Sequence, residues 1–348
     1  MKKTLALALL TASLTAWAAP SAPPSAPPDA PLDPAARAQV ARELARQLRE
    51  RYVFPERVAG IEAALLAATA DDADPPALAQ KLTAALAEAT HDKHLRVDVM
   101  PEQPGGKRAE AAEMRDAWLY GNCGVARVER LRGNLGYLDL REFAPVRDSG
   151  PVLAAAMTVL ARTDALIIDL RRNGGGDPET VALLASYLFD KPTRLIDIRW
   201  RAGNRLEQHW TSAKVAGPRY GQRKPVYVLT ESRTFSAAED FAYGMKARHR
   251  ATLIGENTAG GAHPGDGFRL SPLLMAFIPT GRSVDYVDGG NWEGKGVAPD
   301  HAVPASEALQ LAQRMAIQQL LPTTTHPMKK GALERALAAL DAPPPAKP

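Results

Sequence analysis

Apolar residues recur every three or four positions along the first part of the chain, which is the period of an amphipathic helix. The first pattern begins at Asp33-Pro34, an N-cap followed by proline at the first helical position. Its apolar positions are Val40, Leu44, Leu48 and Tyr52. Two further helical patterns follow, at roughly 57–68 and 77–89. The spacing therefore predicts a small helical N-terminal domain over residues 33–100.

The spacing then changes to that of strands alternating with helices. Residues 101–113 are polar and predict a loop, whereas 165–170 form the continuous apolar run that is typical of a central strand covered on both faces. Other predicted strands cover 125–131, 135–143, 194–200, 206–210, 225–230, 251–255 and 273–278, and predicted helices cover 150–161, 178–189, 237–249 and 306–320. This alternation predicts an α/β core over residues 115–305.

The two ends of the chain have a different composition. Residues 1–18 combine a charged start, an apolar stretch and a small-x-small site, so they predict a signal peptide and an exported, periplasmic or secreted protein. Residues 19–32 are Pro/Ala-rich and predict a disordered linker. Residues 306–348 predict C-terminal helices and a Pro-rich tail. No later apolar run is long enough to predict a transmembrane segment.

Charge and cysteine content exclude several classes of function. The formal net charge is only +4, and two of the positive charges, Lys2 and Lys3, lie in the predicted signal peptide, so we expect no nucleic-acid partner. The single Cys123 excludes an intrachain disulfide. The sequence has no zinc-type Cys/His spacing and no calcium loop, and we predict neither a metal nor a cofactor.

Ser236 lies where a predicted strand meets the N-terminus of a predicted helix. The helix dipole and the N–H of Ala237 would then face an oxyanion formed when the Ser236 hydroxyl attacks a carbonyl. Another interpretation is structural, because Ser236 and Glu239 have the spacing of a capping box. Local sequence leaves both interpretations open.

Gly174-Gly175-Gly176 follows the buried strand at 165–170 and precedes a helix. The spacing matches no phosphate-binding motif, and Asp177 already places a carboxylate at the helix N-cap. Glycines let a substrate approach the main chain closely, so this loop could supply a second N–H to an oxyanion. A tight turn without a catalytic role is the alternative.

A serine nucleophile needs a base, and two of the seven histidines lie in loops of the kind that carry function. His94 stands at a helix-to-strand junction beside Asp92, and His263 lies in a Gly-rich loop predicted over 258–267. Either could be a solvated loop residue, and His94 could be hydrogen-bonded to Asp92 without a catalytic role.

Four motifs in order resemble those of the carboxyl-terminal processing (tail-specific) serine peptidases. The closer resemblance is to the branch that includes the tricorn protease core and interphotoreceptor retinoid-binding protein, and it covers residues 33–305. The motifs are DLRRNGGG at 169–176, TFSAAE at 234–239, GENT at 255–258 and GVAPD at 296–300. The resemblance implies a crotonase-like β-β-α core behind a helical domain, and a peptide or protein substrate.

Carried over by position, the resemblance makes Ser236 the nucleophile. The N–H of Ala237 becomes one oxyanion donor, and that of Gly175 or Gly176 the other. The processing peptidases have a catalytic lysine where this chain has Gly261, so a Ser–Lys dyad is lost.

The tricorn-like branch instead uses a histidine before the core and a late glutamate. His94 and Glu293 match these positions, although Lys93 replaces a serine that precedes the branch's histidine. His263 is then a reserve base or a substrate-binding residue.

These residues predict an exported serine endopeptidase, with cleavage near protein C-termini as the resemblance suggests. Ser236, His94 and Glu293 would form its relay. The alternative is a non-catalytic protein that binds apolar ligands on the same scaffold, as the retinoid-binding relatives do. Retention of all three relay residues favours the enzyme.

Overall fold

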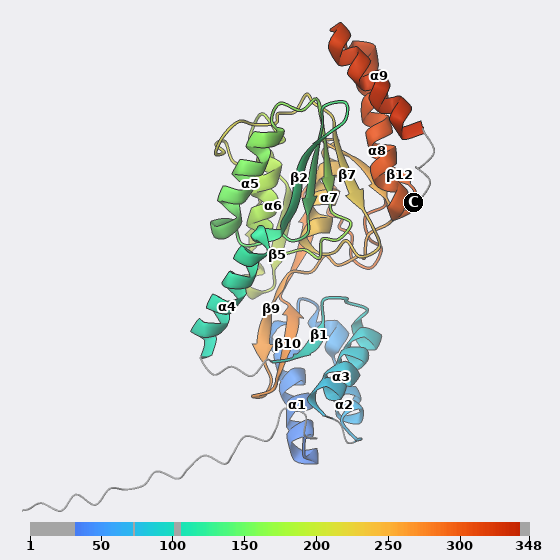
Figure 1. The fold of residues 1–348 in the computed structure, drawn as a ribbon. Coiled ribbons are helices and arrows are strands. Elements are labelled where there is room, and N and C mark those ends of the chain that lie inside the picture. Colours follow the sequence, from blue (N-terminus) through green and yellow to red (C-terminus); the bar gives the residue numbers. More distant parts are fainter. Residues whose placement is uncertain (1–31, 72–73, 101–105, 342–348) are drawn as a thin grey trace, which may run out of the picture.

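The computed structural model describes residues 32–71, 74–100 and 106–341 (Figure 1). The predicted signal peptide, nearly all of the predicted linker and the last residues of the predicted tail lie outside these ranges. Within them the chain has the predicted α/β class, with helices on both faces of a central mixed sheet. No helix in the described ranges is long and apolar enough to cross a membrane.

The N-terminal helices form where the hydrophobic period predicts them. Asp33 and Asp74 cap two of these helices by accepting the N–H groups of Ala36 and Ala77. The helices are α1 (Pro34–Arg51), α2 (Ile61–Ala68) and α3 (Pro75–Thr90), with a 3₁₀ turn at Pro55–Val58 between the first two.

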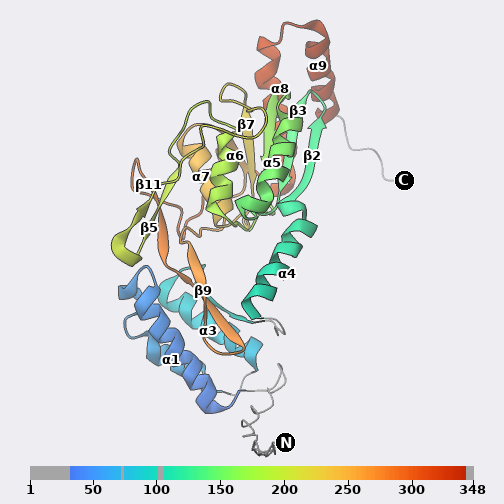
Figure 2. The ribbon, with the colours of Figure 1, turned by 90° about the vertical axis from the view of Figure 1, so that its left-hand side faces the viewer.

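These helices pack on a small antiparallel sheet whose strands come from distant parts of the chain (Figure 2). Its order is β1 (Arg96–Val99), β10 (Leu274–Pro279) and β9 (Gly265–Arg269). Leu44 and Leu82 of the helices share one core with Leu274 and Ile278 of β10. The late segment 265–279 therefore leaves the main core and completes the N-terminal layer, which brings residues near 94 and 263 together.

The main sheet has the order β12-β8-β7-β4-β3-β2, and only the β2–β3 pair is antiparallel. Its strands are β2 (Val125–Leu131), β3 (Leu135–Leu140), β4 (Ala165–Asp169), β7 (Val226–Thr230), β8 (Thr252–Gly255) and β12 (His301–Ala302). Side chains of β4 alternate between two cores: Leu166 and Ile168 lie in one, and Ile167 in the other. Both faces are thus covered, as the continuous apolar run predicts.

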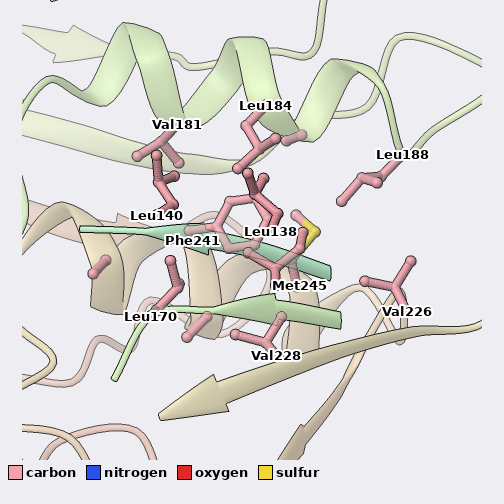
Figure 3. Close-up of a cluster of buried hydrophobic side chains, with 14 of the residues drawn as sticks. Leu138, Leu140, Leu170, Val181, Leu184, Leu188, Val226, Val228, Phe241 and Met245 are labelled. Atoms are coloured by element: carbon pink, nitrogen blue, oxygen red, sulfur yellow. The ribbon is translucent and has the colours of Figure 1, made fainter. Parts of the chain in front are cut away.

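Three helices cover one face of this sheet and two cover the other (Figure 1). The first group is α5 (Val146–Leu160), α6 (Pro178–Ser186) and α7 (Ala237–Ala247), and the second is α8 (Ala305–Leu320) and α9 (Pro327–Asp341). Phe241 of α7 lies among Leu138, Leu170 and Val181 in the first core (Figure 3). This packing fixes the N-terminus of α7, where Ser236 lies.

A third sheet lies beside α7. Its order is β11 (Gly281–Asp285), β5 (Ile196–Trp200) and β6 (Leu206–Glu207). β6 is shorter than the strand predicted over 206–210. The loop predicted over 258–267 is wrong from residue 265 onward, where β9 begins, and the sequence does not predict β11. Asp266 and Gly267 have low strand propensity, and pairing with β10 holds them in β9.

The loop predicted over 101–113 is wrong from residue 106 onward, where α4 (Gly106–Tyr120) begins. The segment is rich in Ala, Glu, Lys, Arg and Met, all good helix formers. Its side chains from 111 to 120 are almost all exposed, so it lacks the apolar stripe by which the other helices were recognised.

Phe241 allows a test of the packing that fixes α7. Its side chain is fully buried, so Phe241→Ala should lower the free energy of unfolding by about 3–5 kcal/mol. Urea denaturation measures the change. Val159→Ala on the exposed side of α5 should change it by less than about 0.5 kcal/mol. Equal effects of the two substitutions would contradict the packing described.

Candidate active site

Ser236 occupies a strained turn between β7 and α7. Its φ of 56° and ψ of −120° lie outside the regions that serine prefers. The Glu239 carboxylate accepts the N–H of Ser236 at 2.9 Å, so this half of the predicted capping box forms. The hydroxyl of Ser236 instead contacts His94. The backbone of Ser236 therefore follows the capping interpretation, while its hydroxyl lies against a histidine.

Glu239 ties the Ser236 turn to the loop at 258–261. Its fully buried carboxylate also accepts the hydroxyl of Thr258 at 2.5 Å and the N–H groups of Gly260 and Gly261 at 2.6 and 2.8 Å. Burial raises the pKa of Glu239, and the hydrogen bonds that it accepts oppose this shift. Glu239 therefore connects the Ser236 turn rigidly to the 258–261 loop.

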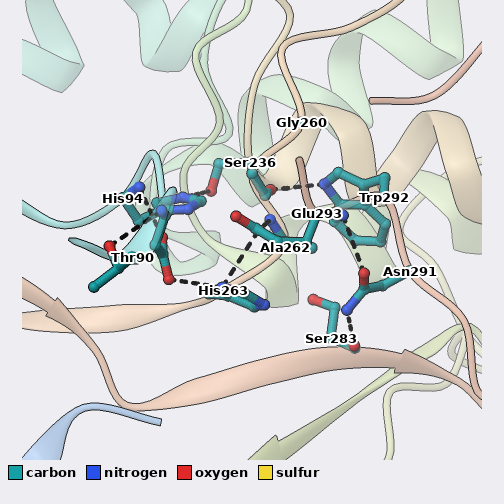
Figure 4. A network of polar contacts seen from close by, with 12 residues as sticks. Thr90, His94, Ser236, Gly260, Ala262, His263, Ser283, Asn291, Trp292 and Glu293 are labelled. Carbon is teal, nitrogen blue, oxygen red and sulfur yellow. Dashed lines mark hydrogen bonds and ion pairs between the residues drawn. The ribbon is translucent and has the colours of Figure 1, made fainter. Parts of the chain in front are cut away.

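His94 faces Ser236 from the N-terminal layer, with 3.1 Å between its Nε2 and the Ser236 Oγ (Figure 4). The left-handed residue His91 ends α3 and turns the chain towards this position. The His94 ring is 4% exposed and packs against Phe235 and Phe277. Burial lowers its pKa to about 4, so the imidazole is neutral at pH 7 and its Nε2 can accept the serine proton.

Asp92 holds the segment that carries His94. One carboxylate oxygen accepts the backbone N–H of His94 at 3.0 Å, and the other accepts the Tyr52 hydroxyl at 3.0 Å and the His263 Nδ1–H at 2.7 Å. Burial alone would raise the pKa of Asp92, but these donors, above all His263, hold it below its usual value. Asp92 thus binds the main chain of His94 and leaves its ring directed at Ser236.

Glu293 lies beside the same ring. A carboxylate oxygen of Glu293, a ring nitrogen of His94 and a carboxylate oxygen of Asp92 lie within 4.8 Å of one another. Glu293 Oε2 accepts the Ala262 N–H at 2.6 Å and lies 3.4 Å from His263 Nδ1. Its Oε1 and the Nδ1 of His94 are both buried, and neither has a hydrogen-bond partner among the described residues. Burial raises the pKa of Glu293 to about 7.

The structure therefore gathers four of the predicted site residues, but in different positions around Ser236. His94 contacts its hydroxyl, whereas His263 lies behind His94 and contacts Asp92 and Glu293 (Figure 4). By distance, Asp92, His94 and Glu293 could also hold a metal ion. Asp92, however, already accepts three hydrogen bonds from other groups.

The glycine loop lies on the other side of Ser236. A side chain at Gly175 would lie 2.7 Å from the Ser236 Cβ, and one at Gly176 would lie 2.1 Å from the Phe143 carbonyl oxygen, so neither position accepts one. The N–H of Gly175 donates to the Asn173 side chain at 2.8 Å. Gly176 and Ala237 line a small cavity together with Ser236. Gly175, whose N–H is taken by Asn173, does not line this cavity.

Gly261 shows why no lysine can stand at its position in this arrangement. A Cβ there would lie 2.2 Å from the Phe235 ring and 2.7 Å from the His94 ring. The space for a side chain from residue 261 is therefore filled by the rings of Phe235 and His94.

Sequence reasoning missed some of the supporting residues. Tyr52 reads as one more apolar position of the first helix, although its hydroxyl reaches Asp92. Glu239 was recognised only as a cap, because its bonds to Thr258, Gly260 and Gly261 span about twenty residues. Local sequence patterns do not predict contacts between residues that lie this far apart in the chain.

Comparison with known proteins identifies the core. Residues 134–303 match the family model described as peptidase family S41. The chain carries a peptidase family S41 domain. This confirms the resemblance to tail-specific peptidases that the four motifs indicate.

One curated relative agrees with this assignment, and two solved structures share the fold. The tail-specific protease of Haemophilus influenzae is 32% identical over 152 residues, which is 41% of this chain and 21% of that protein. A lipoprotein structure from Streptococcus agalactiae has a TM-score of 0.56 and 16% identity, with 81% of this chain and 96% of that chain covered. The tricorn protease structure has a TM-score of 0.50 and 13% identity, with 89% and 37% covered.

These two structures share the fold of this chain. The chain spans less than half the length of the curated relatives that it matches.

Gly261→Ala tests the fit between the 258–261 loop and His94. The added methyl group should displace the His94 ring or Phe235 and lower kcat/KM for the peptide hydrolysis proposed below by about 10²-fold, because small misplacements of reacting groups are costly. Steady-state assays measure the loss. Gly150→Ala on α5 is the control, since a Cβ there meets nothing closer than 3.8 Å. Unchanged activity in Gly261→Ala would contradict the contact.

Proposed function

We propose that this protein is an exported serine endopeptidase that uses Ser236 as its nucleophile and His94 as its base. The observation that carries the proposal is the 3.1 Å contact between His94 Nε2 and Ser236 Oγ. Residues 142 positions apart in the sequence meet there, beside main-chain N–H groups that can receive an oxyanion.

In this mechanism Ser236 Oγ attacks the peptide carbonyl carbon while His94 Nε2 takes the hydroxyl proton. The carbonyl π electrons move to the oxygen, which the N–H groups of Gly176 and Ala237 stabilise. His94 then gives its proton to the leaving amine as the C–N bond breaks, and an acyl-enzyme remains. Water, deprotonated by His94, hydrolyses the ester and restores the Ser236 hydroxyl.

Glu293 acts on the positively charged His94 that forms during these steps. Its ionised carboxylate would stabilise the imidazolium through the Nδ1 side, where both groups have a buried atom without a hydrogen-bond partner among the described residues. Asp92 and His263 support this arrangement by fixing the main chain of His94 and one oxygen of Glu293. His263 is thus a positioning residue in our proposal, and His94 is the base.

The cavity beside Ser236 favours the peptidase over a binding protein for apolar ligands. Its volume is about 40 Å³. Pockets that enclose small-molecule ligands typically measure about 300–1,000 Å³. A short side chain of a peptide fits this space, whereas a large apolar ligand does not.

Further features of the proposal rest on the sequence and on the relatives. Export is supported by the signal-like pattern of residues 1–18, and cleavage near protein C-termini by the name of the tail-specific relative. We also infer a crotonase-like core and a helical N-terminal domain at 33–100, with the core at 115–305. The main sheet with its covering helices, and the N-terminal helices α1 to α3, support this division, although strands β9 and β10 of the core segment pack with the N-terminal helices.

Replacing Ser236 tests the nucleophile. Ser236→Ala should abolish both labelling by a fluorophosphonate probe and cleavage of a peptide library, because the attacking oxygen is lost. Ser232→Ala, an exposed hydroxyl in the same turn, should label and cleave like the parent protein. Equal labelling of Ser236→Ala and the parent protein would rule out Ser236.

The pH dependence of kcat/KM tests Glu293. With a pKa raised to about 7, Glu293 is neutral below this pH and ionised above it, so the rate should rise through pH 7. In Glu293→Gln this step should disappear, the rate should fall by at least about tenfold, and the remaining acid limb should lie near pH 4, where His94 becomes protonated.

The matched control is Glu307→Gln, an exposed carboxylate at the start of α8, which should keep the step at pH 7. If the step persists in Glu293→Gln, another group produces it and the role proposed for Glu293 is wrong.

A further inference from the structure

The residues that line the cavity beside Ser236 indicate on which side of the scissile bond it lies. It is lined by Gly176 and Ala237, whose N–H groups are the proposed oxyanion donors, and not by His94. His94 must lie next to the leaving amine in order to protonate it. The cavity therefore opens on the opposite, acyl side of the scissile bond. It faces the side chain of the residue whose carbonyl is attacked.

The walls of this cavity are mainly apolar but include one carboxyl group. Ile198, Pro264 and Trp292 contribute apolar surface, and Asp240 and Ser283 contribute polar side chains. Asp240 lies one helical turn beyond Ser236, because its N–H donates to the Ser236 carbonyl at 2.9 Å. The carboxyl group is thus carried on the same face of α7 as the nucleophile.

The Asp240 carboxyl has no hydrogen bond to any residue in the described parts of the chain. The cation that acts on it, Arg248, is engaged with both oxygens of Asp285 at 3.0 and 3.1 Å. Burial consequently raises the pKa of Asp240 to about 7, against the weaker effect of Arg248. The Asp240 side chain is half-buried at the cavity, so a substrate group that enters the cavity could supply the missing hydrogen-bond partner.

We propose that Asp240 is a specificity-determining residue that accepts a hydrogen bond from a short hydroxyl side chain, serine above all, on the acyl side of the cleaved bond. This inference rests on the proposed peptidase function and names the substrate class for that same site.

The size of the cavity decides between a hydroxyl and a cation. A cavity needs about 10–15 Å³ to hold one water molecule. The cavity beside Ser236, at about 40 Å³, therefore accommodates about three non-hydrogen atoms. The oxyanion takes one of these positions beside Gly176 and Ala237. A serine side chain, with two non-hydrogen atoms, fits the rest. A lysine or arginine side chain is too long, although its charge would suit a carboxylate.

Peptides that differ only at the residue on the acyl side test this selection. Serine and 2-aminobutyrate have nearly the same shape, and only serine carries a hydroxyl donor. We expect kcat/KM for serine to exceed that for 2-aminobutyrate by about tenfold or more, because the unpaired carboxyl penalises the analogue. This comparison uses the unaltered protein and does not depend on a variant that folds.

Variants then assign the selection to Asp240. Asp240→Ala should reduce the ratio to less than about twofold, while Asp240→Asn, which keeps an acceptor oxygen and the shape, should retain part of it. Asp266→Ala, which removes an exposed carboxylate from β9, should leave the ratio unchanged. Each variant is first titrated with the fluorophosphonate probe, so that rates refer to intact active sites.

The outcomes separate this inference from the proposed function. Hydrolysis with equal rates for serine and 2-aminobutyrate, or with a preference for lysine, overturns the role of Asp240 and leaves the peptidase intact. A selection that survives in Asp240→Ala also overturns it. Failure of the unaltered protein to label and to cleave any peptide overturns the proposed function, and the inference with it.

Discussion

The contact between His94 and Ser236 is the constraint on which the site depends, because it joins two layers that are built separately. Ser236 is fixed by β7 and α7 in the main core, and His94 by α3 and β1 in the N-terminal layer. Strands β9 and β10 leave the main core to pack with the N-terminal helices, and they carry the chain past His263 on the way. The distance between the two side chains is therefore set by the packing of whole layers.

Buried carboxylates fix both partners of this contact. Glu239 binds the backbone of Ser236 and the loop at 258–261, and Asp92 binds the backbone of His94. Burying such groups is unfavourable unless donors surround them, and here each carboxylate accepts several. Glu293 differs, because one of its oxygens has no hydrogen-bond partner among the described residues and its pKa lies near 7. Glu239 and Asp92, which accept several hydrogen bonds, stabilise the structure of the site. Glu293, with one oxygen that accepts none from the described parts of the chain, can respond to positive charge on His94.

Much of this arrangement could be predicted from the sequence, but only the part that local patterns or motifs report. The apolar run at 165–170 indicates a central strand, and the position of Ser236 between strand and helix indicates a hydroxyl at a helix N-terminus. Local sequence alone leaves both His94 and His263 open as the base, and only the family resemblance favours His94. The choice depends on a three-dimensional detail: Asp92 and Glu293 bind His263 and leave His94 to face Ser236.

At Gly261 the fold explains why the sequence lacks the lysine of related peptidases. The resemblance places a lysine of related peptidases at this position, and its loss alone would suggest an inactive protein. A Cβ at 261 would overlap the rings of Phe235 and His94, so the glycine leaves room for both rings. In this chain a side chain at residue 261 and the present positions of these two rings thus exclude each other sterically. In a chain that uses the histidine, the base belongs to a different layer from the nucleophile, and the proposed activity requires both layers to be in place.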